Sequence, residues 1–487
     1  MRYFPDGKAP MRTYGRMLSN TIKNELKRIF GDGNVSFAKE ELLCYAYDAT
    51  NTPHLPDAVV FPSGPDEIAL ILKMANSEGF PVIPRGAGTG FSGGSIPVKG
   101  GVVLSFERMK RILEIDTDNL VAVVEPGVVT WDLQQAVEKS GLFYPPDPSS
   151  LKMSTIGGNI AECAGGPRAI KYGVTRDYVL GLEVVLPTGE IINTGVRTAK
   201  GVVGYDLTRL MVGSEGTLGV ITKATLRLLP LPEETVTMLA LFNDLKDAAK
   251  ATAAIIRAKV VPSTLEIVDS VSMKCVEEYA NVGLPKAGAL LLIEVDGNSE
   301  AVRKEAEAVA GVCLDNGAID FRTARDKNEV KDLWKARRAI SASLFRAKPN
   351  KINEDIVVPR SRIPDLVEGI KDISEKYSVL IASFGHAGDG NIHVNVMYDK
   401  KDAAEAKGAN DAVVEIFKLT LALGGTISGE HGVGTAKMKY LEMELGQQAI
   451  EGMKKIKAAL DPKGILNPGK IFPEASKDTA PSGAFAN

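Results

Sequence analysis

Two short glycine-rich segments near the C-terminal end hold three of the four histidines of this 487-residue chain. The first covers residues 385–393 (GHAGDGNIH) and the second covers residues 428–434 (SGEHGVG). Glycine lets the backbone bend closely around a ligand, while imidazole and carboxylate groups bind metal ions and transfer protons. So little histidine, gathered beside so much glycine, predicts a reaction centre rather than packing.

Polar and apolar residues alternate along residues 391–396 (NIHVNV), which predicts a strand with its polar side chains on one face. His386 precedes a Gly-Asp-Gly loop, so it is expected outside that strand, with its ring free to converge on that of His393. The glycines around Glu430 and His431 allow a bend that aims both side chains inward. Two imidazoles and one carboxylate with an open position form a divalent-metal site of catalytic type. The candidate ligands are His386, His393 and Glu430, and the alternative is a pair of hydrogen-bonded polar loops.

A further glycine-rich stretch, residues 84–95 (PRGAGTGFSGGS), contains the spacing G-x-G-x-x-G at Gly88, Gly90 and Gly93. A dinucleotide-binding fingerprint requires a helix directly after such a loop, whereas residues 96–101 (IPVKGG) do not begin one. A Rossmann nicotinamide site is therefore rejected. The stretch instead predicts a nest of backbone N–H groups around a pyrophosphate, and a flexible hairpin connection is the alternative.

Composition narrows the class of protein. The 58 basic and 61 acidic side chains leave a net charge of −3, which argues against a nucleic-acid partner or a polybasic membrane anchor. The four cysteines are scattered without a C-x-x-C pair, so we expect free thiols in a reducing compartment and no iron–sulfur cluster. No apolar run reaches the ~18 residues of a membrane span. We expect a cytoplasmic protein, and peripheral docking at the inner membrane stays open.

Changes in composition and in the predicted helix and strand pattern along the chain indicate its domains. Residues 1–20 lack a clear period and are expected to form a flexible arm, and residues 473–487 a disordered tail. Short β-branched runs between glycine-rich turns predict an α+β domain over 21–230. Longer helices alternating with strands predict a second α+β domain with an antiparallel sheet over 231–425. Residues 426–472 are expected to complete the first domain and the site.

Other motifs follow the glycine-rich stretch at 84–95 along the chain. They include STIGGNIA at 154–161, GSEGTLGVIT at 213–222 and LDPKGILNPGK at 460–470. With them the chain closely resembles, from about residue 40 to Phe472, the FAD flavoproteins of the vanillyl-alcohol-oxidase type. The branch is that of D-lactate dehydrogenase, the glycolate oxidase FAD subunit and D-2-hydroxyglutarate dehydrogenase. The resemblance implies a two-domain α+β fold, in which an FAD-binding domain is joined to a cap domain that holds the substrate.

The resemblance also implies tightly bound, non-covalent FAD. The residues that it assigns to the cofactor are Arg85, Gly86, Ala87, Gly88, Thr89, Gly90, Ser92, Gly93 and Gly94 at the pyrophosphate, Pro146, Thr155, Gly158 and Asn159 along the flavin and ribityl chain, Ile221 at the adenine or ribose end, and Asn467. Covalent attachment, which some relatives use, needs a histidine or cysteine near the ring. Cys163 and His54 are better explained as structural residues.

Around the histidine segments the resemblance assigns chemical roles. Three residues would bind a divalent metal, Zn, Fe or Mn: His386, His393 and Glu430. The next histidine, His431, would be the base that removes the substrate's hydroxyl proton. In the matching enzymes an arginine on a helix holds the substrate carboxylate, with a hydroxyl one turn later and a lysine downstream. The corresponding residues here are Arg337, Ser341 and Lys351, with Arg338 as the alternative to Arg337.

The activity implied is oxidation of a D-2-hydroxy acid, D-lactate or glycolate first, to the 2-keto acid, with hydride transfer to flavin N5. D-2-hydroxyglutarate is the alternative substrate. An alkylglycerone-phosphate-synthase-like transferase and a non-catalytic flavin electron-transfer subunit are the alternative functions. Because the chain shows neither an iron–sulfur motif nor a nicotinamide fold, we expect an external electron acceptor: an electron-transferring flavoprotein, an iron–sulfur subunit or quinone. A homodimer stays open.

Overall fold

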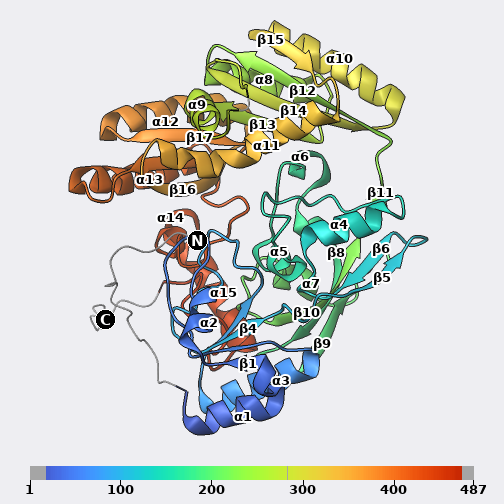
Figure 1. The fold of residues 1–487 in the computed structure, drawn as a ribbon, viewed down its shortest axis with the longest axis vertical. Helices are drawn as coiled ribbons and strands as arrows, with labels where there is room; N and C mark the ends of the chain where they lie inside the picture. Colours follow the sequence, from blue (N-terminus) through green and yellow to red (C-terminus); the bar gives the residue numbers. More distant parts are fainter. Residues whose placement is uncertain (1–17, 282, 474–487) are drawn as a thin grey trace, which may run out of the picture.

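The computed structural model describes residues 18–281 and 283–473, which form two lobes, one above the other (Figure 1). Most of the expected arm at 1–20 and of the expected tail at 473–487 lies outside the described residues. The arm prediction is wrong for residues 18–20. Leu18 is buried, and Ser19 caps helix α1 (Asn20–Phe30) by accepting a hydrogen bond from the N–H of Ile22, so this segment belongs to the lower lobe.

A four-stranded sheet of order β1-β2-β4-β3 forms one part of the lower lobe. Its strands are β1 (Val35–Ser36), β2 (Ala58–Val60), β3 (Val82–Arg85) and β4 (Val102–Ser105), and the short helix α2 (Lys39–Cys44) lies between β1 and β2 in the chain. Helix α3 (Pro65–Glu78) connects β2 to β3 and buries Ile68, Ile71 and Leu72. The i, i+3, i+4 spacing of these apolar residues after an acidic start predicts a helix over residues 66–76, and the structure confirms it. Its proline and acidic first turn suit a helix start.

A five-stranded antiparallel sheet of order β5-β6-β10-β8-β9 completes the strands of the lower lobe. These are β5 (Ile112–Asp116), β6 (Val121–Val124), β8 (Val179–Val185), β9 (Ile191–Gly195) and β10 (Val220–Arg227). Helices α4 (Thr130–Glu138) and α5 (Ile156–Glu162) share a core with this sheet, and α6 (Ala169–Tyr172), α7 (Leu207–Met211) and the small pair β7 (Leu142–Phe143) and β11 (Leu229–Pro230) lie beside it.

The upper lobe is built on one seven-stranded sheet of order β15-β12-β14-β13-β17-β18-β16, in which every neighbouring pair is antiparallel. The strands are β12 (Glu234–Phe242), β13 (Thr264–Asp269), β14 (Ala289–Gly297), β15 (Ala318–Thr323), β16 (Asn350–Val357), β17 (Leu380–His386) and β18 (Asn391–Tyr398). The predicted antiparallel sheet is confirmed.

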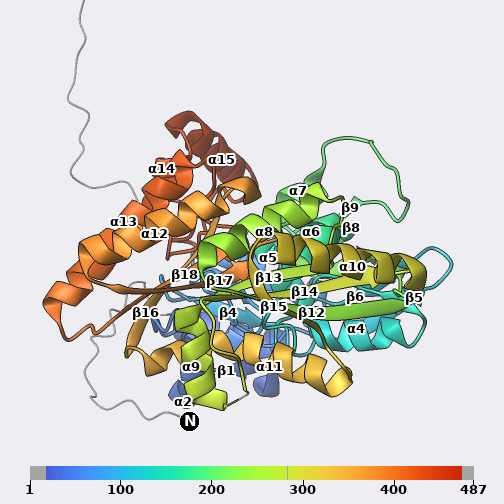
Figure 2. The same ribbon diagram turned by 90° about the horizontal axis from the view of Figure 1, so that it is seen from above.

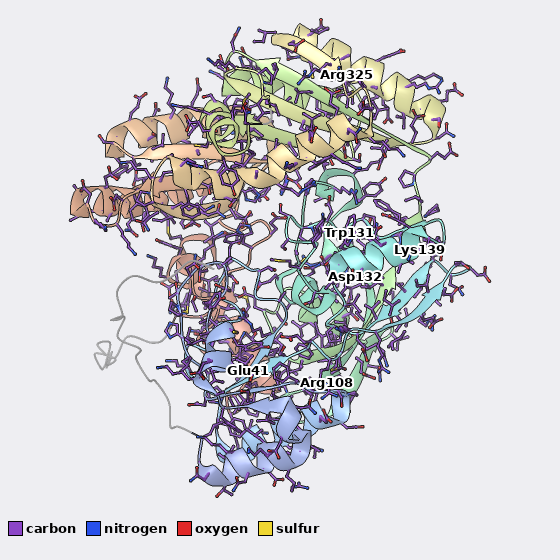
Figure 3. The ribbon with its side chains drawn as sticks, viewed as in Figure 1. Glu41, Arg108, Trp131, Asp132, Lys139 and Arg325 are labelled. Carbon is purple, nitrogen blue, oxygen red and sulfur yellow. The ribbon has the colours of Figure 1, made fainter. Side chains whose placement is uncertain are left out.

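Helices cover both faces of that sheet (Figure 2). One face packs on α8 (Leu245–Arg257), α10 (Ser299–Asp315), α12 (Ile363–Tyr377) and α13 (Ala403–Ala422), and the other on α9 (Ser270–Ala280) and α11 (Lys327–Ser343). Alternate residues of strands such as β12, β14 and β17 enter the two cores, as the pleat requires. Charged side chains such as Arg325 and Lys139 lie on the outer surface of the two lobes (Figure 3).

After α13 the chain returns to the lower lobe. A loop at 426–434 crosses the seam, and helices α14 (Leu441–Glu444) and α15 (Gln447–Leu460) follow it (Figure 1). Leu466 then pairs with Val82 of β3 and is fully buried in the lower core. Within the described residues, no helix is both long enough and apolar enough to cross a membrane.

Candidate active site

A cavity of about 720 Å³ lies where the two lobes meet, a volume typical of ligand and cofactor sites. The lower lobe lines it with the glycine-rich stretch at 84–95 and with residues of α5 and of the loop before β10. The residues that line it from the upper lobe and the crossing loop are Arg337, Arg338, Ser341, Asn353, Phe384, His393, Glu430 and His431. The segments expected to bind FAD and those expected to react therefore face one space.

The glycine-rich stretch at 84–95 begins at the end of β3, and the chain continues from it to β4 without a helix, which confirms that it is no Rossmann fingerprint. The backbone N–H groups of residues 87–90 donate no hydrogen bond to any part of the chain that the structure describes. A Cβ on Gly86 would lie 2.4 Å from Thr155 Oγ1, so only glycine fits there. Unpaired N–H groups at a cavity wall suit an anion such as a pyrophosphate.

Most residues assigned to FAD line the cavity: Arg85, Gly86, Ala87, Gly88, Thr89, Gly90, Gly94, Thr155, Gly158, Asn159 and Ile221. Four others do not line it: Ser92, Gly93, Pro146 and Asn467. They lie behind its wall. Ser92 Oγ accepts a hydrogen bond from the Gly94 N–H at 3.0 Å, and Asn467 Nδ2 donates to the carbonyls of Gly94 and Glu215, both at 2.8 Å.

His386 and His393 face each other across the β17–β18 hairpin. His386 lies outside β18 as expected, but the expectation that the Gly-Asp-Gly loop frees it from the alternation of a strand is wrong, because β17 extends to His386, which pairs with Asn391. Residues paired across a hairpin share a face, so strand geometry rather than loop freedom brings the rings together. Their Nε2 atoms are 3.4 Å apart. The other nitrogen of His386, Nδ1, donates to Glu266 Oε1 at 2.5 Å.

Glu430 completes a triangle with the two histidines. Its Oε1 lies 3.3 Å from His386 Nε2 and 3.6 Å from His393 Nε2. Ligands held at ordinary zinc distances in a tetrahedral site are about 3.3–3.6 Å apart. The three predicted ligand atoms therefore fit one metal ion. The hydrogen bond from His386 to Glu266 is the support that ligating histidines usually have.

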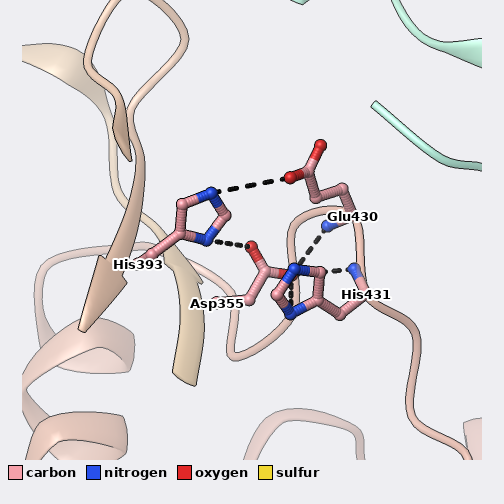
Figure 4. Close-up of side chains that lie close together, drawn as sticks. All are labelled: Asp355, His393, Glu430 and His431. Carbon is pink, nitrogen blue, oxygen red and sulfur yellow. Dashed lines mark hydrogen bonds and ion pairs between the residues drawn. The ribbon is translucent and has the colours of Figure 1, made fainter. Parts of the chain in front are cut away.

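A second set of possible ligands overlaps the first. Asp355, His393, Glu430 and His431 also offer ligand atoms within 4.8 Å of one another (Figure 4). Asp355 is already occupied, because its Oδ2 accepts three backbone N–H bonds from residues 429–431 and its Oδ1 accepts one from Asn391 Nδ2. The triangle of His386, His393 and Glu430 is thus the better donor set.

Burial and charge divide the protonation states of the site. Burial lowers the pKa of His393 well below its usual range, and the neighbouring His386 and His431 add to the effect. Burial also acts to lower the pKa of His386, but the carboxylates of Glu266 and Glu430 outweigh it and raise that pKa well above normal. The neutral His393 ring has the form that a metal ion requires, whereas a metal ion would have to displace the proton from His386 Nε2.

Arg337 is buried on α11 and faces the same carboxylate as His386. Its Nε donates to Glu266 Oε2 at 2.5 Å, and its guanidinium lies 4.9 Å from the centre of the Phe384 ring. Glu266 thus joins the proposed metal site to the proposed carboxylate clamp. Arg338 is exposed and also lines the cavity, with its guanidinium 6.0 Å from the Trp334 ring.

Ser341 lines the cavity, whereas Lys351 does not. The Lys351 ammonium group donates to Ser341 Oγ at 2.6 Å and to the Ser341 carbonyl at 2.8 Å. Burial lowers the pKa of Lys351 to about 8. The side chain of strand β16 that reaches the cavity is Asn353, two residues later.

Sequence reasoning missed Glu266, Asp355 and Asn353. A signal existed for the first two, because Glu266 lies among apolar strand residues in TLEIVD and Asp355 directly precedes the apolar run IVV in NEDIVV. Charged groups are almost never fully buried without partners, so both positions could have been marked as paired groups. Their partners lie far away in the sequence and could not have been named.

Comparison with known protein families agrees with this arrangement. Residues 231–471 match the model described as "FAD linked oxidases, C-terminal domain", and residues 56–195 match that of an "FAD binding domain". The glycolate oxidase subunit GlcD of Bacillus subtilis is 49% identical over 94% of this chain and 97% of its own length. The chain belongs to the FAD-linked oxidases. The resemblance inferred from the motifs is confirmed.

Other relatives of this FAD-linked oxidase have related names. The D-lactate dehydrogenase of Anaerostipes hadrus is 37% identical over 90% of this chain and 93% of its own length. Among solved structures, p-cresol methylhydroxylase superposes with a TM-score of 0.79 at 19% identity, covering 94% of this chain and 98% of that one. The 4-ethylphenol oxidase of Gulosibacter chungangensis gives 0.74 at 24%, covering 93% and 97%. These structures confirm the predicted two-domain flavoprotein fold.

Proposed function

We propose that this chain oxidises a D-2-hydroxy acid, D-lactate or glycolate first, to the 2-keto acid, with FAD as cofactor. The observation that carries the proposal is the single cavity lined by the N–H nest and by the histidine, glutamate and arginine groups. Relatives named glycolate oxidase subunit and D-lactate dehydrogenase support the same substrate class.

The lower lobe would hold FAD. The free N–H groups of residues 87–90 fit the pyrophosphate, while Thr155, Gly158 and Asn159 fit the flavin side and Ile221 the adenine side. Bound FAD would accept two electrons and the substrate's Cα hydrogen as a hydride. Cys44 lines the cavity, whereas the two residues considered for covalent attachment, His54 and Cys163, do not, and the proposed binding is non-covalent.

His386, His393 and Glu430 would hold a divalent metal, with zinc, iron and manganese as candidates. Bound there, the ion would polarise the substrate's 2-oxygen and lower the pKa of its hydroxyl group. The three ligand atoms come from both strands of one hairpin and from the crossing loop, and all three residues are at least half-buried.

A buried polar atom without a partner supports a polar substrate beside this triangle. Asn353 Oδ1 is buried without a hydrogen-bond partner in the described part of the chain. Such atoms are costly unless a ligand or water pairs with them. Both Nε and Nη2 of Arg337 already contact Glu266 Oε2, which leaves Nη1 of the guanidinium for a substrate carboxylate.

His431 would remove the hydroxyl proton. Its ring stacks between Phe91, at 5.1 Å, and His393, at 5.3 Å, so its orientation is fixed at the cavity wall. Its Nδ1 lies 3.9 Å from Asp355 Oδ2, beyond hydrogen-bond distance, and this buried carboxylate would stabilise the protonated ring.

The electrons would leave through an external acceptor: an electron-transferring flavoprotein, an iron–sulfur subunit or quinone. Two of the relatives are named as subunits of a glycolate oxidase, which supports a partner protein. A cytoplasmic protein that docks at the periphery of the inner membrane would meet any of these acceptors.

Anaerobic titration of the flavin tests the proposed reaction. We expect D-lactate or glycolate to bleach the oxidised flavin spectrum, with L-lactate as the matched control that leaves it unchanged. Bleaching by D-2-hydroxyglutarate alone would move the substrate to the dicarboxylic acid. A flavin that none of the three acids reduces would contradict the proposed function.

Replacing Arg337 with lysine should raise KM roughly 10- to 100-fold, because an ammonium group cannot replace the planar guanidinium at the carboxylate. Steady-state kinetics and a melting curve measure the effect and the folding. Arg338→Lys is the control, since Arg338 lines the cavity from an exposed position, and its KM should stay near that of the original chain. A reversed pattern would give the clamp to Arg338.

A further inference from the structure

Five backbone N–H groups of the loop at 429–434, here called the site loop, bond to two buried carboxylates. Asp355 Oδ2 accepts from Gly429 at 3.0 Å, from Glu430 at 2.8 Å and from His431 at 2.9 Å. Glu215 accepts from Val433 at 2.8 Å and from Gly434 at 2.7 Å, one bond to each oxygen. The two residues with proposed chemistry, Glu430 and His431, thus lie on a segment anchored at both ends.

The two carboxylates come from different lobes. Asp355 lies on β16 of the upper sheet and is fully buried, whereas Glu215 lies in the lower lobe, beside the cavity, and is 6% exposed. Glu215 has a φ of 52°, which is unfavourable for a residue with a side chain. Asn467 holds its carbonyl at 2.8 Å. Such backbone strain persists only where the surroundings fix it.

We infer that Asp355 and Glu215 are positioning residues that clamp the site loop from the two lobes and thereby set the places of Glu430 and His431. The inference rests on the proposed roles of these two residues. It gives no ligand or proton-transfer role to Asp355 itself.

The bonding of Asp355 supports a positioning role over a ligand role. A carboxylate has about four lone-pair sites. Oδ2 has two of these sites and already accepts three bonds from the site loop, and Oδ1 accepts one bond from Asn391 Nδ2 at 2.6 Å. Consecutive N–H groups that converge on one oxygen form an anion nest, in which the side chain occupies the place of a bound anion. Removing it would leave the N–H groups of Glu430 and His431 without a partner, because the N–H of Gly429 also donates to the Asp355 carbonyl at 3.0 Å.

Hydrogen exchange of peptides that cover the site loop tests the clamp directly. Asp355→Ala and Glu215→Ala should each speed exchange of the site-loop amides roughly 10-fold or more, and Glu215→Gln, which keeps one acceptor oxygen, should speed it by less. Asp355→Asn keeps one acceptor oxygen and should restore part of the protection. The control is Asp269→Asn, because Asp269 is a buried carboxylate of the same lobe that accepts N–H bonds from Ser272 and Ser383 instead.

Cobalt(II) binding gives the second readout. Asp355→Ala should weaken cobalt affinity by roughly 10- to 100-fold, the usual cost of losing a residue that supports metal ligands. Asp355→Asn should recover part of that affinity with an unchanged cobalt absorption spectrum. If Asp355 were a ligand, Asn and Ala would bind cobalt equally weakly and the spectrum would change, and the inference would be wrong.

The remaining outcomes also decide. If Asp355→Ala does not fold, the milder variants Glu215→Gln and Asp355→Asn take its place. Unchanged hydrogen exchange of the site loop in both of these variants would overturn the clamp. Equal acceleration in Asp269→Asn would show general loosening and overturn it as well. An original chain that binds no cobalt would contradict the proposed metal site, while the exchange data would still judge the clamp.

Discussion

Replacing His431 with alanine or asparagine is expected to slow flavin reduction by the substrate roughly 10²- to 10⁴-fold, the usual scale for losing a general base, while FAD stays bound. The ring is held between Phe91 and His393 at the cavity wall, and the stacked His393 ring is the proposed metal ligand, so it would not be free to accept the proton. Anaerobic stopped-flow measurement of flavin reduction gives the rate directly, without the external acceptor.

His54→Asn is the matched control for the loss of a histidine, because His54 is the one histidine outside the two segments and does not line the cavity. Its rate of flavin reduction should equal that of the original chain. If His431→Ala also reduced its flavin at the original rate, His431 would only shape the site loop, and another group would have to accept the proton.

Removal of the metal should abolish turnover and leave the flavin spectrum intact. A chelator would strip an ion held by two imidazoles and one carboxylate, whereas FAD is bound by other residues of the lower lobe. One divalent ion per chain should restore activity. His393→Ala should lower both metal content and activity by roughly 10²-fold or more, since its Nε2 lies at one corner of the triangle.

Elemental analysis of the purified protein, before and after chelation, accompanies these rates. Two results would contradict the metal site: full activity without stoichiometric metal, or a metal content that His393→Ala does not change. The histidines would then be direct hydrogen-bond partners of the substrate, a role that their burial beside Arg337 also permits.

Local patterns in the sequence predicted much of the fold. The apolar spacing at Ile68, Ile71 and Leu72 gave a helix, and the alternation at 391–396 gave a strand with His393 on its polar face. These predictions hold because helix and strand periods depend on neighbours a few residues away. Residue types were equally informative. The glycines at 84–95 indicated an anion nest, and His386, His393 and Glu430 indicated a metal site.

The sequence by itself determined the kinds of chemistry and the elements that carry them, from the glycine-rich stretch to the pair His386 and His393. Only the tertiary structure decided which groups meet. Glu266 joins His386 and Arg337 across 120 and 71 residues, and Glu215 reaches Gly434 across 219. It also extended β17 through His386 and turned Lys351 toward Ser341 instead of the cavity. Such partners depend on strand register and on the contact between the lobes. A buried charge is stable only with a partner, and because that partner comes from a distant segment, no local sequence pattern identifies it.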